Sequence, residues 1–243
     1  MHSTLRREVR IIYNYLLKQS GKVFETVKLL RETERGSVAL LRHRDSGKAY
    51  VFRRFHGTSD VYRRLLHINC PYLPRVYETA EQGTQTLVLE EYISGDNLYE
   101  MLKSAVFTPK ETKSVAAELC RALWVLHSLG AVHRDVKPEN VILRPTGAVL
   151  IDFDASRVFK AESESDTRVL GTVGYAAPEQ FGLSQTDARA DIYSLGVLMN
   201  VILTGKHPSQ EPAKGHLGRV IQKCTMTAPE KRFPDILHVM EAL

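Results

Sequence analysis

The sequence predicts an α+β fold of two unequal lobes, a small β-rich lobe followed by a larger α-helical one. Three observations support this prediction. Strand patterns dominate residues 23–89, helix-spaced apolar residues dominate after Gly95, and the change between them falls in one short stretch, Glu91–Gly95. We expect this stretch to be a hinge, with lobes of about residues 22–92 and 93–243. A cleft between two such lobes is a natural ligand site.

The β-rich part contains three predicted strands and one helix. Val38–Leu41 and Ala49–Phe55 are predicted to be strands joined by a turn at Asp45–Gly47, and Thr86–Leu89 is a third strand. Ser59–Ile68 is predicted to be a short helix with Ser59 as its N-cap. In the second lobe, helical spacing of apolar residues predicts three helices: Pro109–Leu129, Ala190–Leu203 and Leu217–Cys224.

Residues 1–21 are predicted to form an amphipathic helix that ends at Gly21. Its apolar residues share one stripe: Leu5, Val9, Ile12, Tyr13 and Leu16. Arginines and a lysine occupy the remaining positions. Two interpretations stay open, a helix docked on its own domain and a helix that contacts a second copy or another partner.

Composition excludes several classes of function. The net charge of +5 is mild, and no run of Lys and Arg suggests a nucleic-acid-binding arm. The cysteines Cys70, Cys120 and Cys224 lack metal-ligand spacing, so we expect reduced, buried thiols in a cytoplasmic protein. No secretory signal and no stretch of ~20 apolar residues is present, so any membrane tether would lie outside this chain.

The segments that carry chemistry lie in the second half of the chain. They are His133–Asn140, Ile151–Asp154, Gly171–Glu179, Asp191–Gly196 and Arg232. In this order and spacing they resemble the eukaryotic-like Ser/Thr protein kinases, and the compact chain is similar to the bacterial members of that family, over roughly Val23–Leu243. The resemblance implies a bilobal kinase fold and a signalling enzyme that transfers the γ-phosphate of ATP, with Mg²⁺, to Ser or Thr hydroxyls of proteins.

The resemblance also assigns roles to four residues of the second lobe. Asp135 would orient the attacking hydroxyl or accept its proton, and Lys137 would reach the transferred phosphate. Asn140 and Asp152 would be ligands of Mg²⁺, which prefers carboxylate and amide oxygens.

Four further residues are implied to support the site, and the last three named here would be scaffold without a part in the chemistry. Thr172 would brace Asp135 and Lys137 through its hydroxyl, Glu179 and Arg232 would pair, and Asp191 would hold the backbone of the catalytic loop.

Nucleotide contacts are implied for several other positions. Val38 and Val51 would lie above the adenine ring and Ile142 below it, although their periodicity also suits ordinary core residues. Glu91 belongs to the strand that enters the hinge. Gly36 is the one glycine that remains of a phosphate-binding loop, where Arg31 and Arg35 could add positive charge or simply be surface residues.

The chain departs from the family pattern in three other places. Arg53 stands where a lysine is usual, and a guanidinium is larger and planar. Val61 stands where the following helix usually carries the glutamate that pairs with that lysine. Asp154 stands where a glycine usually follows Asp-Phe, which should stiffen the segment.

Glu90 is unusual in the same region, because its position at the back of the nucleotide pocket is normally apolar. A buried carboxylate needs a partner, so we hypothesise that Glu90 pairs with Arg53 and replaces the missing helix glutamate. The alternative is a strand shifted by one residue, which would turn Glu90 to solvent.

Regulation is expected between Asp152 and Pro178. Ser163, Ser165 and Thr167 lie where the family places activating phosphorylation, and Arg134 would offer a cationic partner to a phosphate. The alternative is a flexible acidic loop, since Glu162, Glu164 and Asp166 alternate with these hydroxyls.

Three functions follow from these patterns. The first is an active Ser/Thr protein kinase, the second is a pseudokinase that senses nucleotide or acts as a scaffold, and the third is a kinase-fold enzyme acting on a small molecule. The peptide-binding character of Gly171–Glu179 argues against the third. The protein substrate, the pathway and the oligomeric state are not encoded in any pattern of the sequence.

Overall fold

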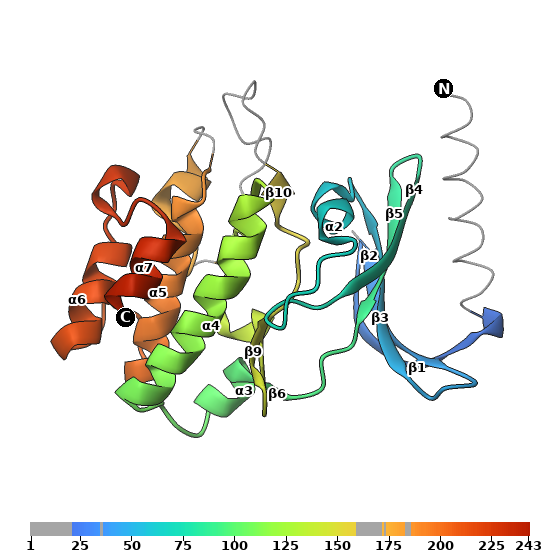
Figure 1. Ribbon diagram of the computed structural model, residues 1–243, viewed down its shortest axis with the longest axis horizontal. Coiled ribbons are helices and arrows are strands. Elements are labelled where there is room, and N and C mark those ends of the chain that lie inside the picture. The colour runs from blue at the N-terminus through green and yellow to red at the C-terminus, as the bar shows by residue number, and fades with distance from the viewer. Residues whose placement is uncertain (1–20, 35, 159–171, 173, 183–185) are drawn as a thin grey trace. The chain divides into compact units, whose positions relative to one another are not determined.

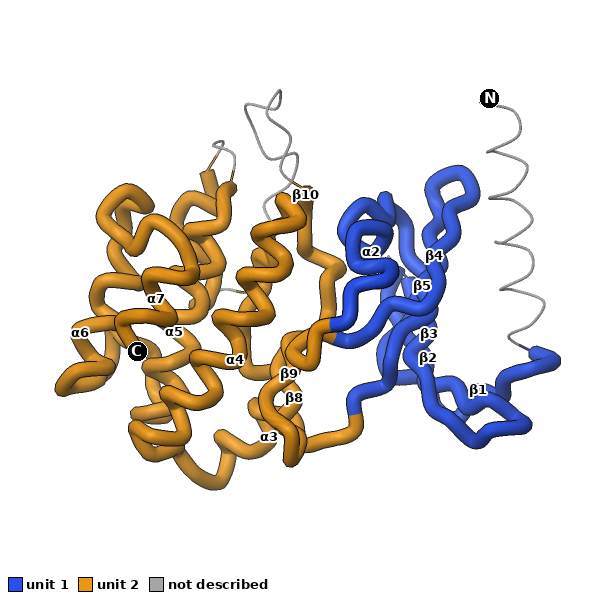
Figure 2. Tube along the Cα trace, in the orientation of Figure 1, with its two compact units in different colours: residues 1–69, 74–93 blue, residues 70–73, 94–243 orange. Residues whose placement is uncertain are grey.

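The computed structural model describes residues 21–34, 36–158, 172, 174–182 and 186–243. The chain divides into two compact units (Figure 2). Unit 1 comprises Met1–Asn69 and Pro74–Ile93, and unit 2 comprises Cys70–Leu73 and Ser94–Leu243. All of the predicted N-terminal helix except Gly21 lies outside the described residues. The predicted combination of a β-rich part and a helical part is confirmed.

Unit 1 is built on a five-stranded antiparallel sheet with the order β1-β2-β3-β5-β4 (Figure 1). Its strands are β1 (Phe24–Thr33), β2 (Gly36–His43), β3 (Ala49–His56), β4 (Val76–Gln82) and β5 (Gln85–Glu91). The three predicted strands correspond to β2, β3 and β5, and the predicted turn joins β2 to β3 through a hydrogen bond from the N–H of Gly47 to the carbonyl of His43. The sequence patterns missed β1 and β4.

The short helix α2 (Asp60–Leu65) is attached to β4 by a hydrogen-bonded carboxylate. Ser59 occupies the N-cap position, as predicted, although its hydroxyl makes no capping bond. Its N–H and its hydroxyl both donate to Oε1 of Glu81 at 2.5 Å, and Arg63 donates to Oε2 of the same residue. Burial alone raises the pKa of Glu81, but the bonds from Ser59 and the charge of Arg63 outweigh it and lower the pKa below its ordinary value.

Unit 2 is mainly helical, and its predicted helices are all present (Figure 1). Its described helices are α3 (Leu98–Leu102), α4 (Pro109–Ser128), α5 (Arg189–Thr204), α6 (Gly215–Cys224) and α7 (Ile236–Ala242), and the three predicted helices correspond to α4, α5 and α6. α4 begins with a capping box, in which Thr108 and Glu111 each accept a backbone hydrogen from the other. Side chains of α4 and α5 form the centre of the core, including Leu119, Leu123, Leu126, Leu195 and Leu198, all fully buried.

Short strands and turns of unit 2 carry the polar motifs. The strands are β6 (Asp96–Asn97), β7 (Ala131–Val132), β8 (Val141–Arg144), β9 (Gly147–Leu150) and β10 (Arg157–Val158). β8 lies between β6 and β9, and β7 pairs with β10. The described part of unit 2 also contains three 3-10 turns: η1 (Pro138–Asn140), η2 (Pro178–Phe181) and η3 (Pro229–Lys231).

The cysteines carry free thiols. Cys120 and Cys224 are buried, as expected, and burial raises the pKa of Cys120 to about 12. Cys70 is only half-buried, which departs from the expectation. Among the helices that the structure describes, none combines the length and the apolar character needed to cross a membrane.

Candidate active site

One buried carboxylate at the start of α5 fixes the backbone of the loop that carries Asp135. Oδ1 of Asp191 accepts the N–H of Arg134 at 2.7 Å, and Oδ2 accepts the N–H of His133 at 2.8 Å. Nε2 of His127 also donates to Oδ2 at 2.8 Å. Burial alone raises the pKa of Asp191, but the bonds from His127 and the backbone outweigh it and lower the pKa below its ordinary value. The predicted contact of Asp191 with this loop is confirmed.

His133 connects the loop to the strand end before Asp152. Its Nδ1 accepts the N–H of Asp135 at 3.3 Å, and its Nε2 lies 3.3 Å from the carbonyl oxygen of Ile151. Both bonds form at once in the neutral tautomer that is protonated on Nε2. Full burial lowers the pKa of His133, which favours this neutral form.

The Asp135 carboxylate is oriented by three side chains. Thr172 donates its hydroxyl to Oδ1 at 2.6 Å, while Nδ2 of Asn140 at 3.0 Å and Nζ of Lys137 at 2.8 Å approach Oδ2. Nζ of Lys137 also donates to the hydroxyl of Thr172 at 2.7 Å. The predicted position of Thr172 between Asp135 and Lys137 is therefore confirmed. With its oxygens held in this way, the carboxylate has one defined orientation.

Asn140 and Asp152 lie at the same end of the β8–β9 pair. The N–H of Ile151 donates to the carbonyl of Asn140 at 2.9 Å, so Asp152 follows directly from this contact. Nδ2 of Asn140 also donates to the carbonyl of Asp135 at 2.8 Å, which directs the amide nitrogen toward the loop. Asp152 adopts a left-handed backbone with φ of 69°, a conformation that costs energy for a residue other than glycine and is concentrated at functional sites.

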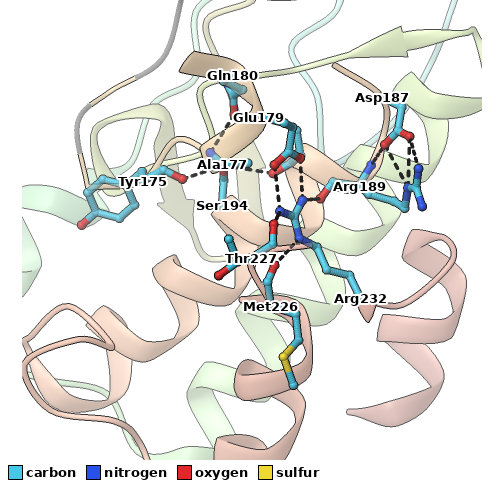
Figure 3. A network of polar contacts seen from close by, with 11 residues as sticks. Tyr175, Ala177, Glu179, Gln180, Asp187, Arg189, Ser194, Met226, Thr227 and Arg232 are labelled. Atoms are coloured by element: carbon cyan, nitrogen blue, oxygen red, sulfur yellow. Dashed lines mark hydrogen bonds and ion pairs between the residues drawn. The ribbon is translucent and has the colours of Figure 1, made fainter. Parts of the chain in front are cut away.

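Glu179 and Arg232 form a bidentate ion pair (Figure 3), with Nη1 2.6 Å from Oε1 and Nη2 2.8 Å from Oε2. The side chain of Arg232 is fully buried. Its remaining bonds go to three backbone carbonyls, those of Arg189, Met226 and Thr227. The predicted pairing is confirmed, and it ties η2 to α5 and to the segment before η3.

Gln180 links η2 to the catalytic loop and was not recognised from the sequence. Its Oε1 accepts the N–H of Ala177 at 3.0 Å, and its Nε2 donates to the carbonyl of Arg134 at 2.9 Å. Arg134 has a positive φ of 69°, so this carbonyl is held in an uncommon direction. The position of Gln180 directly after Glu179 was the one available sequence signal.

In unit 1, Arg53 and Glu90 form a buried ion pair. Nε of Arg53 lies 2.5 Å from Oε1 of Glu90, and the two side chains are 6% and 2% exposed. In the strand register Arg53 is opposite Val88 and Val51 is opposite Glu90, so the pair lies diagonally on one face of the sheet. The hypothesis that these two residues pair is confirmed, and the shifted register that would expose Glu90 is wrong.

The other predicted nucleotide-binding residues are divided between the units. Val38 and Val51 are buried on the same face of the unit 1 sheet as Arg53, whereas Ile142 lies in β8 of unit 2. Gly36 begins β2, where a Cβ atom would lie 2.0 Å from the carbonyl oxygen of Arg54. Glu91 ends β5, and its N–H donates to the carbonyl of Arg75 at 2.8 Å.

The sequence pattern of the protein kinase domain family matches residues 24–238, nearly the whole length of the chain. The chain belongs to the protein kinase family.

Curated relatives agree with this assignment. The chain is 32% identical over 228 residues to ribosomal protein S6 kinase alpha-6 of Danio rerio, an alignment that covers 88% of this chain and 31% of the relative. It is 31% identical over 202 residues to serine/threonine-protein kinase pkn2 of Myxococcus xanthus, covering 79% of the chain and 24% of the relative. It is 37% identical over 150 residues to PknB of Mycobacterium tuberculosis, covering 58% and 24%. The chain thus spans about a third or less of the length of these relatives.

Kinase membership implies the use of ATP. The residue types of unit 2 also fit a magnesium ion, because the amide nitrogen of Asn140 is engaged with Asp135, which leaves its oxygen as the hard donor, and Asp152 offers a carboxylate. Within the described residues no cluster of three or more His, Cys, Asp or Glu side chains could hold a metal. A kinase magnesium site does not need one, because phosphate oxygens and water complete the coordination shell.

The predicted regulatory hydroxyls lie outside the described residues: Ser163, Ser165 and Thr167. Arg35 also lies outside them. Asp154 is described, and its N–H donates to Oδ1 of Asp152 at 3.3 Å.

Proposed function

We propose that this protein kinase domain transfers the γ-phosphate of ATP to Ser or Thr hydroxyls of protein substrates. The observation that carries the proposal is the Asp135 carboxylate, which Thr172, Asn140 and Lys137 hold in one orientation. Phosphoryl transfer depends on positioning and charge neutralisation more than on covalent participation of the protein. A carboxylate fixed in this manner suits the orientation of an incoming hydroxyl and the acceptance of its proton.

The neighbouring side chains supply the remaining requirements. Asn140 and Asp152 are the residues that would hold Mg²⁺, which when bound neutralises negative charge on the nucleotide phosphates. Lys137 brings a cation next to Asp135 and would meet the transferred phosphate as it develops charge. Because the Lys137 ammonium already bonds Asp135 and Thr172, little reorganisation is needed during transfer.

Nucleotide binding by unit 1 is part of the proposal. Arg53 would contact the phosphates in place of the usual lysine, supported by its buried position and by the cation that a guanidinium always provides. Gly36 would bring backbone near the phosphates, and Val38, Val51 and Ile142 would contact the adenine ring. Glu91 would contribute backbone at the hinge.

The wider organisation is also proposed. We infer a single kinase domain over residues 22–243 preceded by an amphipathic helix over residues 1–21, which would contact its own domain, a second copy or a partner. The Myxococcus and Mycobacterium relatives support a bacterial-type Ser/Thr kinase with a divergent first lobe. A cytoplasmic site of action, as a free protein or as part of a longer tethered chain, is consistent with its thiols and charge.

A phosphotransfer assay with Mg-ATP and a general protein substrate tests the proposal. Wild-type protein should transfer phosphate, and Asp135→Asn should lower kcat by about 100-fold or more, because the proton acceptor is lost while the side-chain shape is kept. Phosphoamino-acid analysis should find phosphoserine or phosphothreonine. A wild-type protein that binds Mg-ATP and transfers no phosphate would contradict the proposal.

One observation favours a second candidate, a pseudokinase that senses nucleotide or acts as a scaffold. Two of the departures from the family pattern affect the expected phosphate contacts of unit 1, where Arg53 replaces lysine and one glycine of the phosphate loop remains. This candidate predicts a rise in melting temperature with ATP and no transfer by the wild-type protein.

A further inference from the structure

Kinases commonly hold the strand lysine through a glutamate on the following helix, and movement of that helix controls whether the pair is formed. In this chain the corresponding cation has its partner inside the sheet. Arg53 of β3 pairs with Glu90 of β5, and β3 and β5 are hydrogen-bonded neighbours from Tyr50 to His56. The pair is therefore held by the strand ladder itself.

Helix α2 is attached to the sheet by an ion pair whose charges are reversed relative to the usual lysine–glutamate pair. The helix supplies the cation, Arg63, and β4 supplies the carboxylate, Glu81. The acidic residue of α2 is Asp60, which accepts a hydrogen bond from Thr58 at 3.2 Å, and the helix buries Val61, Tyr62 and Leu65. The helix therefore faces the sheet with apolar side chains where the usual arrangement has a glutamate.

The burial of the Arg53–Glu90 pair constrains what it can do. Both side chains are more than nine-tenths shielded, and a buried carboxylate or guanidinium without its partner is strongly unfavourable. A pair with little access to water does not exchange partners readily. The planar guanidinium, bonded through Nε, is thus fixed in direction by Glu90.

We propose that Glu90 is a positioning residue that replaces the helix glutamate and keeps the nucleotide anchor Arg53 in place independently of helix α2. This inference rests on the proposed function, because it assigns regulation of the same nucleotide site. A kinase built in this way is not switched by displacement of α2.

A pair of matched variants tests the inference. Glu90→Gln keeps the side-chain shape and removes the charge that orients Arg53, and it should raise the KM for ATP about 10- to 100-fold while the KM for the protein substrate stays unchanged. Glu81→Gln weakens the attachment of α2 and should lower the melting temperature, yet it should keep the KM for ATP within about 2-fold of wild type. A purely structural role of Glu90 would not affect one substrate selectively.

A double-mutant cycle keeps the test valid if Glu90→Gln unfolds. Arg53→Leu with Glu90→Leu leaves no unpaired buried charge and should fold, as a circular dichroism melt would establish. Calorimetry would then compare the affinity for Mg-ATP of the double variant with that of a folded single variant, Arg53→Gln. If Glu90 acts only through Arg53, the two proteins should bind Mg-ATP equally weakly. A further loss in the double variant would overturn the positioning role.

The outcomes separate this inference from the proposed function. An active wild type in which Glu90→Gln leaves the KM for ATP unchanged, or in which Glu81→Gln raises it as strongly, overturns the inference alone. If the wild type binds Mg-ATP without phosphate transfer, the Kd for Mg-ATP measured by calorimetry takes the place of KM. Glu90→Gln and Glu81→Gln are then each compared with the wild type in the same way. A wild type that neither binds nor uses ATP overturns both.

Discussion

Nζ of Lys137 lies 2.8 Å from Oδ2 of Asp135, so the proposed proton acceptor and the cation proposed to meet the transferred phosphate are already in contact. The Thr172 hydroxyl closes a triangle with them, because it donates to Asp135 and accepts from Lys137. A hydroxyl can perform both roles at once, whereas a methyl group can perform neither.

Replacement of Thr172 by alanine should therefore impair catalysis more than stability. Loss of the hydroxyl leaves Asp135 and Lys137 less well oriented, and we expect kcat to fall about 10- to 100-fold. Thr172→Ser keeps the hydroxyl and should stay within about 3-fold of wild type. Steady-state kinetics with saturating Mg-ATP would measure both, and equal losses in the two variants would contradict the role of the hydroxyl.

Asp191→Asn should destabilise unit 2, because the carboxylate accepts two backbone N–H groups and a bond from His127. An amide NH₂ in place of one oxygen would face a buried donor, which we expect to lower the free energy of unfolding by about 3 kcal/mol. Asp187→Asn is the matched control, since Asp187 forms a partly exposed pair with Arg189 and should cost less than about 1 kcal/mol. Urea denaturation would compare them, and similar costs would argue against the anchoring role.

The sequence patterns predicted the contacts of unit 2 well because each motif carries its own partners. Thr172, Asp191, Glu179 and Arg232 were expected to make the contacts that the structure contains. His133 and Gln180 were not, because the family resemblance was used to assign roles to other positions and their bonds to backbone atoms point to no second residue in the sequence.

Unit 1 shows a different limit of prediction. β1 was missed because it is an exposed edge strand and its register with β2 shifts twice, between Thr26 and Lys28 and between Leu29 and Arg31. Each irregularity breaks the two-residue alternation by which strands are recognised. The Arg53–Glu90 pair could be predicted because two unusual residues stood on neighbouring strands, an arginine in place of a lysine and a glutamate at a normally apolar position. A buried carboxylate requires a partner, and Arg53 was the nearest unusual cation.

Arg232→Lys keeps the positive charge but should still lower the stability of unit 2. The guanidinium makes two bonds to Glu179 and three to backbone carbonyls from a fully buried site, and an ammonium has only three donors and no planar fork. We expect the free energy of unfolding to fall by about 3 kcal/mol or more. Replacing both partners, as in Arg232→Met with Glu179→Leu, should cost less than the sum of the single changes. Urea denaturation of the two single variants and the double variant would measure these losses. If the loss of stability in the double variant equals the sum of the single losses, the two side chains are not energetically coupled.

Gly36→Ala should destabilise unit 1 through a direct clash. The new Cβ would lie 2.0 Å from the carbonyl oxygen of Arg54 and 2.7 Å from Cα of Phe55, so β2 and β3 would have to separate at this end. We expect a loss above about 2 kcal/mol in the free energy of unfolding. Gly83→Ala, which meets no atom within 4 Å but has φ of 62°, should cost only about 1 kcal/mol. Equal costs would indicate that backbone conformation, and not the clash, determines the requirement at Gly36.

Buried His133 should make the stability of the protein depend on pH between neutrality and mild acid. Burial lowers its pKa in the folded state, while the unfolded chain regains a pKa of about 6.5. Below that pH the unfolded state binds a proton that the folded state does not, so stability falls by up to about 1.4 kcal/mol per pH unit until the folded-state pKa is reached. His133→Gln should be less stable at pH 8, because one of two buried bonds is lost, but its stability should change less between pH 7 and pH 5. Urea denaturation across this range would measure the difference in slope, and parallel pH curves for the two proteins would show that His133 is not the group that titrates.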